Sequence, residues 1–204
     1  MYLDQTIKHN KERKVEKIML LALVGVTGVG KTYFKDKIVE KFDFKKINTI
    51  RTRKKRIGEE QGVVGLFMTN EELEEIKKEG KLAYDFEVFG GRYAYLKDEV
   101  FSKDNMIFEM HYTTIYDWKK IRPDIITIYI IPTEIEKAKE QTRKRNLTKE
   151  KEKERLEEID EHYNKILNDN KLREMFDYVV YNNYDEESEK SILNLVENIL
   201  NMTV

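Results

Sequence analysis

The chain has 204 residues, of which 40% are hydrophobic, enough to bury the core of one sizeable domain or of one domain carrying a small insert. Its 38 basic and 39 acidic residues leave a net charge of -1, so no overall electrostatic field draws the protein to nucleic acid or to a membrane surface. Cysteine is absent, which excludes disulfides, thiolate nucleophiles and cysteine-bound zinc, and three scattered histidines do not indicate a metal site.

Residues 1–17 form a polar, charged extension in front of the first apolar run, and we expect a frayed tail or a short surface helix there. The apolar run, residues 18–26, is far shorter than the roughly 20 residues that cross a bilayer. The polar segment before it is also unlike a secretory signal peptide. These features predict a cytoplasmic protein that has neither a membrane nor a nucleic acid as its partner.

A glycine-rich segment follows the first predicted strand, residues 19–24, and precedes a helical pattern that begins near Tyr33. It reads Gly25, Val26, Thr27, Gly28, Val29, Gly30, Lys31 and Thr32. Glycines allow positive φ angles, so successive backbone NH groups turn inward and bind phosphate oxygens at a helix N-terminus. Lys31 adds a positive charge for the β- and γ-phosphates, and Thr32 adds a hydroxyl ligand for magnesium. The segment therefore predicts a P-loop that binds a nucleoside triphosphate.

The remaining elements alternate along the chain between short apolar runs and helical patterns. Strands are expected over residues 46–52, 84–88, 106–110, 125–131 and 178–181, and helices over residues 70–79, 134–144, 150–167 and 187–200. Such alternation is typical of parallel βαβ units, in which helices cover both faces of the sheet. We therefore predict a three-layer α/β P-loop fold with a central parallel sheet over residues 18–204.

The stretch between Arg56 and Lys97 differs in composition from its surroundings. Several glycines there surround a short helix and aromatic strands, whereas the flanking helices are rich in lysine and glutamate. This shift predicts a small inserted α+β lobe over residues 53–97 that closes over the site. The core would then comprise residues 18–52 and 98–204.

The order of several short motifs resembles that of the guanylate kinases. Arg53-Lys54-Lys55-Arg56-Ile57-Gly58-Glu59 leads to Gly62 and Phe67, then to Asn70-Glu71-Glu72-Leu73, Gly80 and Gly90-Gly91-Arg92-Tyr93. In that family an equivalent arginine stretch, short helix and glycine–tyrosine element build the lobe that holds the nucleoside monophosphate. Val179-Val180-Tyr181-Asn182 also looks like the family's late strand with its adenine-side asparagine. The resemblance runs from about residue 18 to the C-terminus.

The resemblance implies an acceptor site and a magnesium site. Arg53 and Arg56 match the two arginines that hold the acceptor phosphate, and Tyr93 matches a tyrosine that hydrogen-bonds it. The acceptor set also includes Thr49, Tyr84, Glu109 and His111. Glu109 ends a predicted strand, where it would bind magnesium together with Thr32 or orient the acceptor.

The resemblance also implies a lid, at about residues 141–156, whose arginines neutralise the transferred phosphoryl group. Arg143, Arg145 and Arg155 are the candidates, and they would act together with Lys31. The family's R-x-x-x-R spacing is not reproduced, because Gln141 stands four residues before Arg145. The sequence leaves open which of the three arginines reaches the phosphates.

Several positions depart from the family's pattern where it reads guanine. Gly65 stands where guanylate kinases have a tyrosine, and Tyr84 stands where they have a glutamate, although Asp85 or Glu87 would take that place if the register shifts. Ala94-Tyr95 replaces a Gly-Ser/Thr pair, and His111 replaces the aspartate of an acid-x-Asp pair. A buried guanine needs an acceptor for its donor edge, so these substitutions argue against guanine specificity.

The resemblance implies phosphoryl transfer from ATP, with Mg²⁺, to a nucleoside monophosphate, GMP or another, by a monomer or homodimer. Two alternatives keep the fold: a kinase of ribose 1,5-bisphosphate, which also lacks guanine contacts, and a catalytically silent binding module. Silent modules of membrane-associated scaffolds usually lose the P-loop, whereas Lys31 and Thr32 are intact here. A GTPase is disfavoured because the chain contains neither a D-x-x-G nor an N-K-x-D motif.

Overall fold

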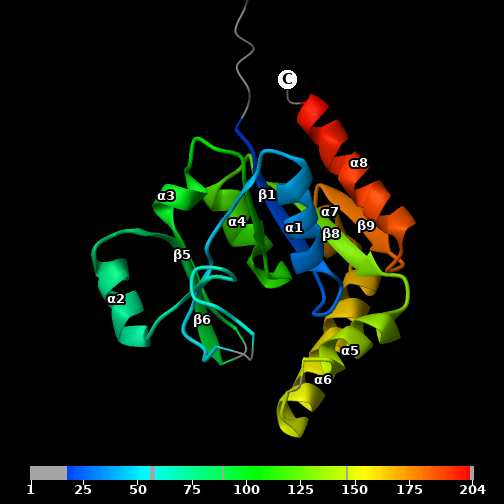
Figure 1. Ribbon diagram of the computed structural model, residues 1–204, viewed down its shortest axis with the longest axis horizontal. Coiled ribbons are helices and arrows are strands. Elements are labelled where there is room, and N and C mark those ends of the chain that lie inside the picture. The colour runs from blue at the N-terminus through cyan, green and yellow to red at the C-terminus, as the bar shows by residue number, and fades with distance from the viewer. Residues whose placement is uncertain (1–17, 56–57, 89, 146, 203–204) are drawn as a thin grey trace, which may run out of the picture.

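The computed structural model describes residues 18–55, 58–88, 90–145 and 147–202. Its centre is a five-stranded, fully parallel sheet in the order β2-β7-β1-β8-β9. Figure 1 shows β1, β8 and β9 of this sheet with helices around them. The strands are β2 (Lys45–Lys46), β7 (Met106–Glu109), β1 (Leu20–Gly25), β8 (Ile126–Pro132) and β9 (Tyr178–Asn182). The predicted fold class, an α/β protein with a parallel central sheet, is confirmed.

Strand β1 is buried on both faces, which explains its unbroken apolar run. Leu21 and Leu23 pack into one core layer, whereas Leu20 and Ala22 pack into the other, because successive side chains of a strand point to opposite faces. Such continuous hydrophobic runs are typical of parallel sheets that helices cover on both sides. The P-loop begins at the carboxyl end of this central strand.

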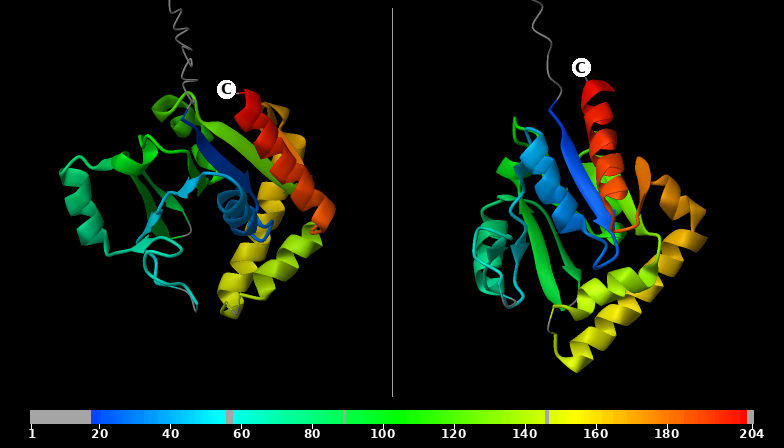
Figure 2. Two further views of the ribbon diagram at one scale, coloured as in Figure 1. Left: turned by 45° about the horizontal axis from the view of Figure 1, so that its top comes forward. Right: turned by 45° about the vertical axis from the view of Figure 1, so that its right-hand side comes forward.

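Helices cover both faces of the sheet (Figures 1 and 2). Helices α1 (Lys31–Lys41) and α8 (Glu186–Met202) place Ile38 and Val196 in the same core cluster as Leu23. On the other face, a 3₁₀ turn (Tyr112–Thr114) and α4 (Ile115–Ile121) contribute to a second cluster around the fully buried Trp118. The sheet is therefore the middle layer of three.

A second, four-stranded sheet forms a small lobe beside the main sheet, with the order β4-β3-β6-β5 (Figure 1). Its strands are β3 (Ile50–Arg51), β4 (Leu66–Phe67), β5 (Leu82–Val88) and β6 (Gly91–Leu96). Helix α2 (Asn70–Lys78) packs on it through Leu73, which meets Ile50 and Ala94 in a small core, and α3 (Lys97–Val100) leads back to the main sheet. Thr69 and Glu72 form a capping box that fixes where α2 begins.

Helices α5 (Ile135–Arg143) and α6 (Lys149–Asn168) project beyond the carboxyl ends of the strands, side by side (Figure 2). Helix α6 begins after Thr148, whose hydroxyl accepts a hydrogen bond from the Lys151 amide. The short α7 (Asn170–Glu174) then leads into β9. The junction of α5 and α6 falls inside the segment in which the sequence predicts a lid.

One predicted strand, residues 46–52, is wrong. The chain forms β2 at its start and β3 near its end, and these strands belong to different sheets. The Ile47 amide still donates to the Ile107 carbonyl of the main sheet, after which the backbone leaves towards the small lobe. The sequence of residues 46–52 does not show that the chain changes from one partner strand to another within this run. Helices α3, α4 and α7 were not predicted, because each is too short for a helical repeat of apolar residues to be recognised in the sequence.

Candidate active site

The glycine-rich segment has the backbone geometry that was expected of a P-loop. Gly25, Gly28 and Gly30 all have positive φ angles, of 147°, 84° and 95°. A Cβ atom on Gly28 would lie 2.1 Å from the Ala138 carbonyl oxygen of α5, and one on Gly25 would lie 2.5 Å from that of Ile130 in β8. Glycine is therefore required here both for conformation and for close packing of the loop.

Lys31 lies at the start of α1 and folds back over the loop. Its Nζ donates hydrogen bonds to the carbonyls of Gly25 and Val26, at 2.8 and 2.9 Å. Burial lowers the pKa of Lys31 to about 8, although the nearby Glu109 carboxylate opposes that shift. The loop thus holds an ammonium group at its mouth, next to the backbone NH groups at the N-terminus of α1.

Glu109 lies at the carboxyl end of β7, next to β1, and its carboxylate connects two other side chains of the site. It accepts hydrogen bonds from Thr32 Oγ1 at 2.9 Å and from Lys35 Nζ at 2.7 Å. Burial alone would raise the pKa of Glu109, but the ammonium groups of Lys35 and Lys31 outweigh it and lower the pKa to about 2. The carboxylate is therefore charged throughout the physiological range.

A hydroxyl and a carboxylate that touch one another at the end of a P-loop fit a magnesium site. Mg²⁺ prefers oxygen ligands and is usually held by one or two protein groups, with substrate phosphates and waters completing the octahedron. Thr32 and Glu109 supply such a pair. They are the residues that would hold the ion when a triphosphate occupies the loop.

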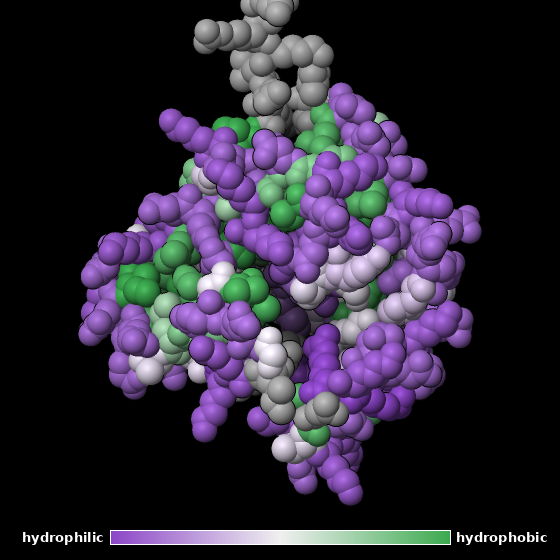
Figure 3. All heavy atoms as spheres, viewed as in Figure 1, coloured by the Kyte–Doolittle hydropathy of each residue, from purple (hydrophilic) through white to green (hydrophobic). Residues whose placement is uncertain are grey.

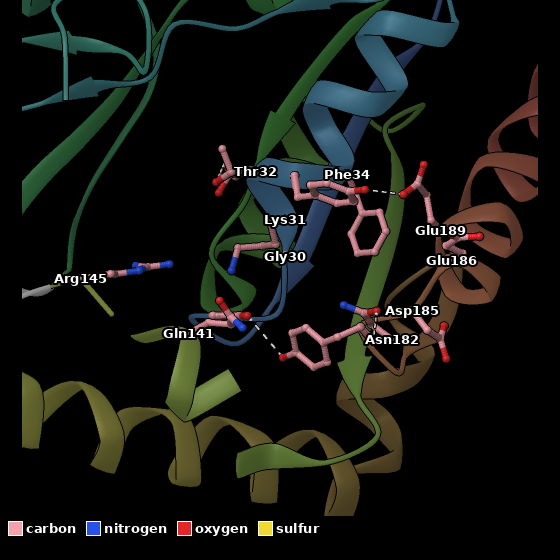
Figure 4. A pocket seen from close by; sticks show the side chains of 14 residues that line it. Gly30, Lys31, Thr32, Phe34, Gln141, Arg145, Asn182, Asp185, Glu186 and Glu189 are labelled. Carbon is pink, nitrogen blue, oxygen red and sulfur yellow. Dashed lines mark hydrogen bonds between the residues drawn. The ribbon is translucent and has the colours of Figure 1, made fainter. Parts of the chain in front are cut away.

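Two pockets meet at these residues. The first, which we call the α8 pocket, has a volume of about 580 Å³ and lies between the P-loop, α1 and the start of α8 (Figure 4). The second, the lobe cleft, has a volume of about 540 Å³ and lies between the P-loop, the small lobe and α6. Figure 3, viewed as in Figure 1, shows a hollow at the centre of the molecule's surface, with mostly hydrophilic residues around it. Both pockets are lined by Lys31, Thr32, Glu109 and Arg145.

Asn182 and Tyr184 form the wall of the α8 pocket behind the P-loop. Asn182 Nδ2 donates to the Val29 carbonyl at 3.0 Å, and the Tyr184 hydroxyl donates to the Gly28 carbonyl at 3.3 Å. Tyr184 itself has a positive φ of 62°, which is rare for a residue other than glycine. The predicted Asn182 therefore lines the α8 pocket and also braces the loop.

Arg53 lines the lobe cleft opposite the P-loop. Its two terminal nitrogens bind both carboxylate oxygens of Glu59 at 2.6 Å, and Tyr93 also hydrogen-bonds it. Burial would lower the pKa of Arg53, but Glu59 and Tyr93 raise it overall. Thr49 and His111 line the same cleft, so the structure brings these predicted acceptor residues together. Arg56 lies outside the described residues.

The three predicted lid arginines lie in different places. Arg145 lines both pockets, and Arg155 of α6 lines the lobe cleft, where its Nη1 donates to Glu158 at 2.8 Å. Arg145 as a whole is exposed, but desolvation of its guanidinium and the nearby Arg155 lower its pKa. Arg143 is exposed and lies 3.8 Å from Glu136; it is absent from the described lining residues of both pockets.

Tyr84 is not brought to the site. It is absent from the described lining of the lobe cleft, and its hydroxyl donates to Asp117 at 2.8 Å beside the ring of Trp118. Burial and the Asp117 carboxylate raise its pKa. Two other members of β5, Phe86 and Val88, line the cleft instead. Asp85, the alternative in case of a register shift, pairs with Arg92 at 2.7 Å.

Sequence reasoning missed two residues on α6. Glu158 and His162 follow Arg155 at positions three and seven, on one face of the helix, and all three line the lobe cleft. His162 Nε2 lies 2.6 Å from the Tyr129 hydroxyl, and burial lowers its pKa to about 2. His111 is held neutral in the same way, with its pKa lowered to about 4 by burial and by Lys31. The helical spacing from Arg155 was the signal that would have found this face.

Comparison with known proteins agrees with the geometry. The family model described as guanylate kinase matches residues 17–199. The chain belongs to the guanylate kinase family. It is 27% identical over 187 residues to a guanylate kinase of Wolbachia pipientis wMel, which covers 87% of this chain and 89% of that protein. A guanylate kinase of Mycoplasma mobile is also 27% identical, over 190 residues, covering 87% of this chain and 92% of that one.

Solved structures support the same fold. The guanylate kinase of Anaplasma phagocytophilum matches with a TM-score of 0.66 at 22% identity, covering 91% of this chain and 85% of that one. A shikimate kinase of Bacteroides thetaiotaomicron matches with a TM-score of 0.50 at 11% identity, over 91% and 99% of the two chains, which concerns the fold alone. As a member of the guanylate kinase family, the chain is a nucleoside monophosphate kinase. No helix in the described part of the chain is long and apolar enough to cross a membrane.

Proposed function

We propose that this protein transfers the γ-phosphoryl group of ATP to the phosphate of a nucleoside monophosphate bound in the lobe cleft, with Mg²⁺ as cofactor. The observation that carries the proposal is that the α8 pocket and the lobe cleft share Lys31, Thr32, Glu109 and Arg145. A donor in one pocket and an acceptor in the other would bring their phosphates together at these four side chains.

The donor end follows from the P-loop. The triphosphate would lie against the backbone NH groups of residues 25–32 and exchange hydrogen bonds with Lys31, which now donates to two loop carbonyls. The adenosine would lie in the α8 pocket, beside Asn182. Thr32 and Glu109 would hold Mg²⁺, which neutralises charge on the phosphates during transfer.

The acceptor end follows from the small lobe. Arg53 offers a forked guanidinium that matches phosphate geometry, and Glu59 and Tyr93 hold it in place. Arg56 is proposed as its companion from the sequence alone. Since Arg53 lies across the cleft from Lys31, an acceptor phosphate on Arg53 would face the γ-phosphoryl group.

Catalysis would rest on positioning and charge stabilisation. Phosphoryl transfer passes through a loose transition state that spreads negative charge over its oxygens, so pre-positioned cations lower the barrier. Arg145 reaches both pockets and Arg155 reaches the cleft, whereas Arg143 lines neither in the described chain. We therefore assign the lid function to Arg145 and Arg155. A silent binding module is disfavoured, because the loop, Lys31 and Thr32 are fully formed.

The test is a substrate screen with Mg-ATP and each of GMP, AMP, CMP, UMP and ribose 1,5-bisphosphate. Acceptor-dependent ADP formation is expected with at least one of them. Lys31→Ala should reduce that rate by at least about 100-fold, because a charge that acts on the transferred phosphates is lost. Lys37→Ala removes an exposed lysine of the same helix and should stay within about twofold of the wild type. Absence of acceptor-dependent ADP across the panel would contradict the proposal.

A further inference from the structure

Every described carboxylate that lines the lobe cleft is already in an ion pair. The pairs are Asp36 with Lys46 at 2.8 Å, Glu59 with Arg53 at 2.6 Å, Glu109 with Lys35 at 2.7 Å, and Glu158 with Arg155 at 2.8 Å. Guanine presents two kinds of NH donor on one edge, and burying them unpaired carries a large penalty. Each of these carboxylates therefore already has a cation next to it, and only its remaining oxygen lone pairs could accept from that edge.

Arg51 adds a cation to the same cleft. It lies two residues before Arg53, on the same side of the chain, and both guanidinium groups lie over the ring of Phe67, at 5.8 and 5.3 Å. Arg51 Nη1 donates to the Val64 and Thr49 carbonyls at 2.5 and 3.3 Å. Within the described chain, its Nε and Nη2 have no hydrogen-bond partner and no carboxylate pairs with it.

Gly65 makes this position of Arg51 possible. A Cβ atom on residue 65 would lie 1.8 Å from Arg51 Nη1 and 2.5 Å from the Thr49 carbonyl oxygen. Gly65 also has a φ of 147°, which side chains rarely adopt. Any larger residue there would displace the guanidinium, so the glycine and the arginine act as a pair.

The described lining of the lobe cleft combines apolar surface with an excess of cations, eight lysine and arginine side chains against four carboxylates. Phe86 and Val88 present apolar side chains, and the Tyr95 hydroxyl is engaged with Thr49 and the Glu109 carbonyl. A group with acceptor atoms and no donors is therefore the best match for this end of the cleft. Phosphate and carboxylate are such groups, and both accept bidentate hydrogen bonds from arginine.

We propose that Arg51 is a specificity-determining residue that binds a second anionic group of the acceptor, so that the substrate is a phosphorylated compound with two anionic groups rather than GMP. The proposal rests on the proposed function, since it assumes that the first phosphate of the acceptor lies on Arg53. Nucleoside bisphosphates belong to this class and keep the phosphate of a nucleoside monophosphate as the acceptor, and a sugar bisphosphate is the comparison compound that has two phosphates but no base. Guanine would place its donor edge against side chains that are apolar, cationic or already ion-paired.

The experiment compares kcat and KM for GMP, adenosine 3′,5′-bisphosphate and ribose 1,5-bisphosphate in the wild type and in Arg51→Gln. A bisphosphate should be the better substrate of the wild type, with kcat/KM at least about tenfold above that of GMP. Arg51→Gln should raise the KM for that bisphosphate by about 10- to 100-fold and leave the KM for ATP within about twofold. Arg51→Lys should recover part of the loss, because a charge without the fork remains.

Arg173→Gln is the matched control, since Arg173 also donates to a backbone carbonyl, that of Leu167, and is absent from the described lining of the cleft. Thermal unfolding of each variant shows whether it is folded. Wild-type preference for GMP, or an unchanged KM for the preferred acceptor in folded Arg51→Gln, would overturn the inference while leaving the proposed kinase activity intact. If no acceptor supports ADP formation, both the inference and the proposed function fail.

Discussion

The P-loop changes the pKa of Lys31, the lysine at its end. Its ammonium is buried against the Gly25 and Val26 carbonyls, and burial lowers its pKa to about 8. A triphosphate bound at the same place would favour the charged form and raise that pKa again. Binding of Mg-ATP is therefore coupled to protonation of this one side chain.

The coupling predicts that the affinity for Mg-ATP falls as pH rises from 7.5 to 9.5. Free Lys31 loses its proton through about pH 8, so each further pH unit should weaken binding by up to about tenfold, with proton uptake on binding. Calorimetry in buffers of different ionisation enthalpy measures both quantities. Lys31→Arg keeps its charge over this range and should bind with little pH dependence. An equally steep decline in the arginine variant would contradict the assignment to Lys31.

For single residues, the sequence showed which residue types the site needs better than it showed which side chains lie in the site. The P-loop residues and Arg53 were proposed from local motifs and Glu109 from its place at the end of a predicted strand, and all of these residues lie around the two pockets. Tyr84 was placed in the acceptor set by alignment with a motif, yet its hydroxyl lies on Asp117. Arg51 was overlooked, because only the packing against Gly65 shows that its guanidinium enters the cleft.

At the scale of elements, the P-loop packs so closely against α5 that only a glycine fits at position 28. A Cβ on Gly28 would lie 2.1 Å from the Ala138 carbonyl oxygen and 2.9 Å from Thr142 Oγ1. Both contacts are to α5, the helix that leads to Arg145. The loop that binds the donor and the helix that carries the lid are therefore expected to shift together.

Gly28→Ala should destabilise the protein by about 2–4 kcal/mol, because left-handed strain and overpacking against backbone add. Gly80→Ala is the matched control: Gly80 also has a positive φ, of 70°, but no described atom lies within 4 Å of its added Cβ. It should cost only about 1–2 kcal/mol. Urea unfolding measures both free energies, and equal losses would show that the contact with α5 is unimportant.

Helices with a clear repeat of apolar residues were predicted from the sequence. Strands whose bounds depend on which neighbouring strand they pair with were not. Residues 150–167 became α6 (Lys149–Asn168) with bounds close to the expected ones. The run over residues 46–52 instead divides between β2 and β3, since hydrogen bonding to Ile107 ends at Ile47. The identity of the neighbouring strand is a long-range property that local residue types do not encode.

At the scale of the whole molecule, a buried histidine joins α6 to the main sheet. His162 is 2% exposed, hydrogen-bonds the Tyr129 hydroxyl of β8 and stacks on Tyr112, with ring centroids 3.7 Å apart. Burial lowers its pKa to about 2, so the folded protein keeps it neutral where the unfolded chain binds a proton. Stability from this group is complete above about pH 6.5 and is lost as pH falls below that value.

Thermal and urea unfolding between pH 8 and pH 4.5 test this coupling. The wild type should lose up to about 1.4 kcal/mol of unfolding free energy per pH unit below 6.5 from this residue. His162→Gln retains a polar side chain without the titration and should show a shallower decline. The difference in unfolding free energy between the two proteins at pH 8, where both side chains are neutral, serves as the reference for the lower pH values. Parallel curves below pH 6.5 would rule out His162 as the source.

The lining residues that the α8 pocket and the lobe cleft share also come from distant parts of the chain. Lys31 and Arg145 are over a hundred positions apart, and Arg53 follows β3 of the separate four-stranded sheet. The sequence predicted that these residues act together only through resemblance to a family. The convergence of Lys31 and Arg145 follows from the parallel sheet, because the segments that carry them leave the carboxyl ends of the neighbouring strands β1 and β8.

Binding of adenosine 5′-pentaphosphate tests the central claim, that the P-loop and Arg53 lie on the two sides of one phosphate path. Its polyphosphate chain extends past the γ-position of ATP, from the α8 pocket into the lobe cleft. Arg53→Gln should weaken binding of the pentaphosphate by about tenfold or more and leave that of Mg-ATP unchanged, whereas Lys31→Ala should weaken both. If calorimetry shows that Arg53→Gln binds the pentaphosphate as tightly as the wild type does, the two pockets do not share a path.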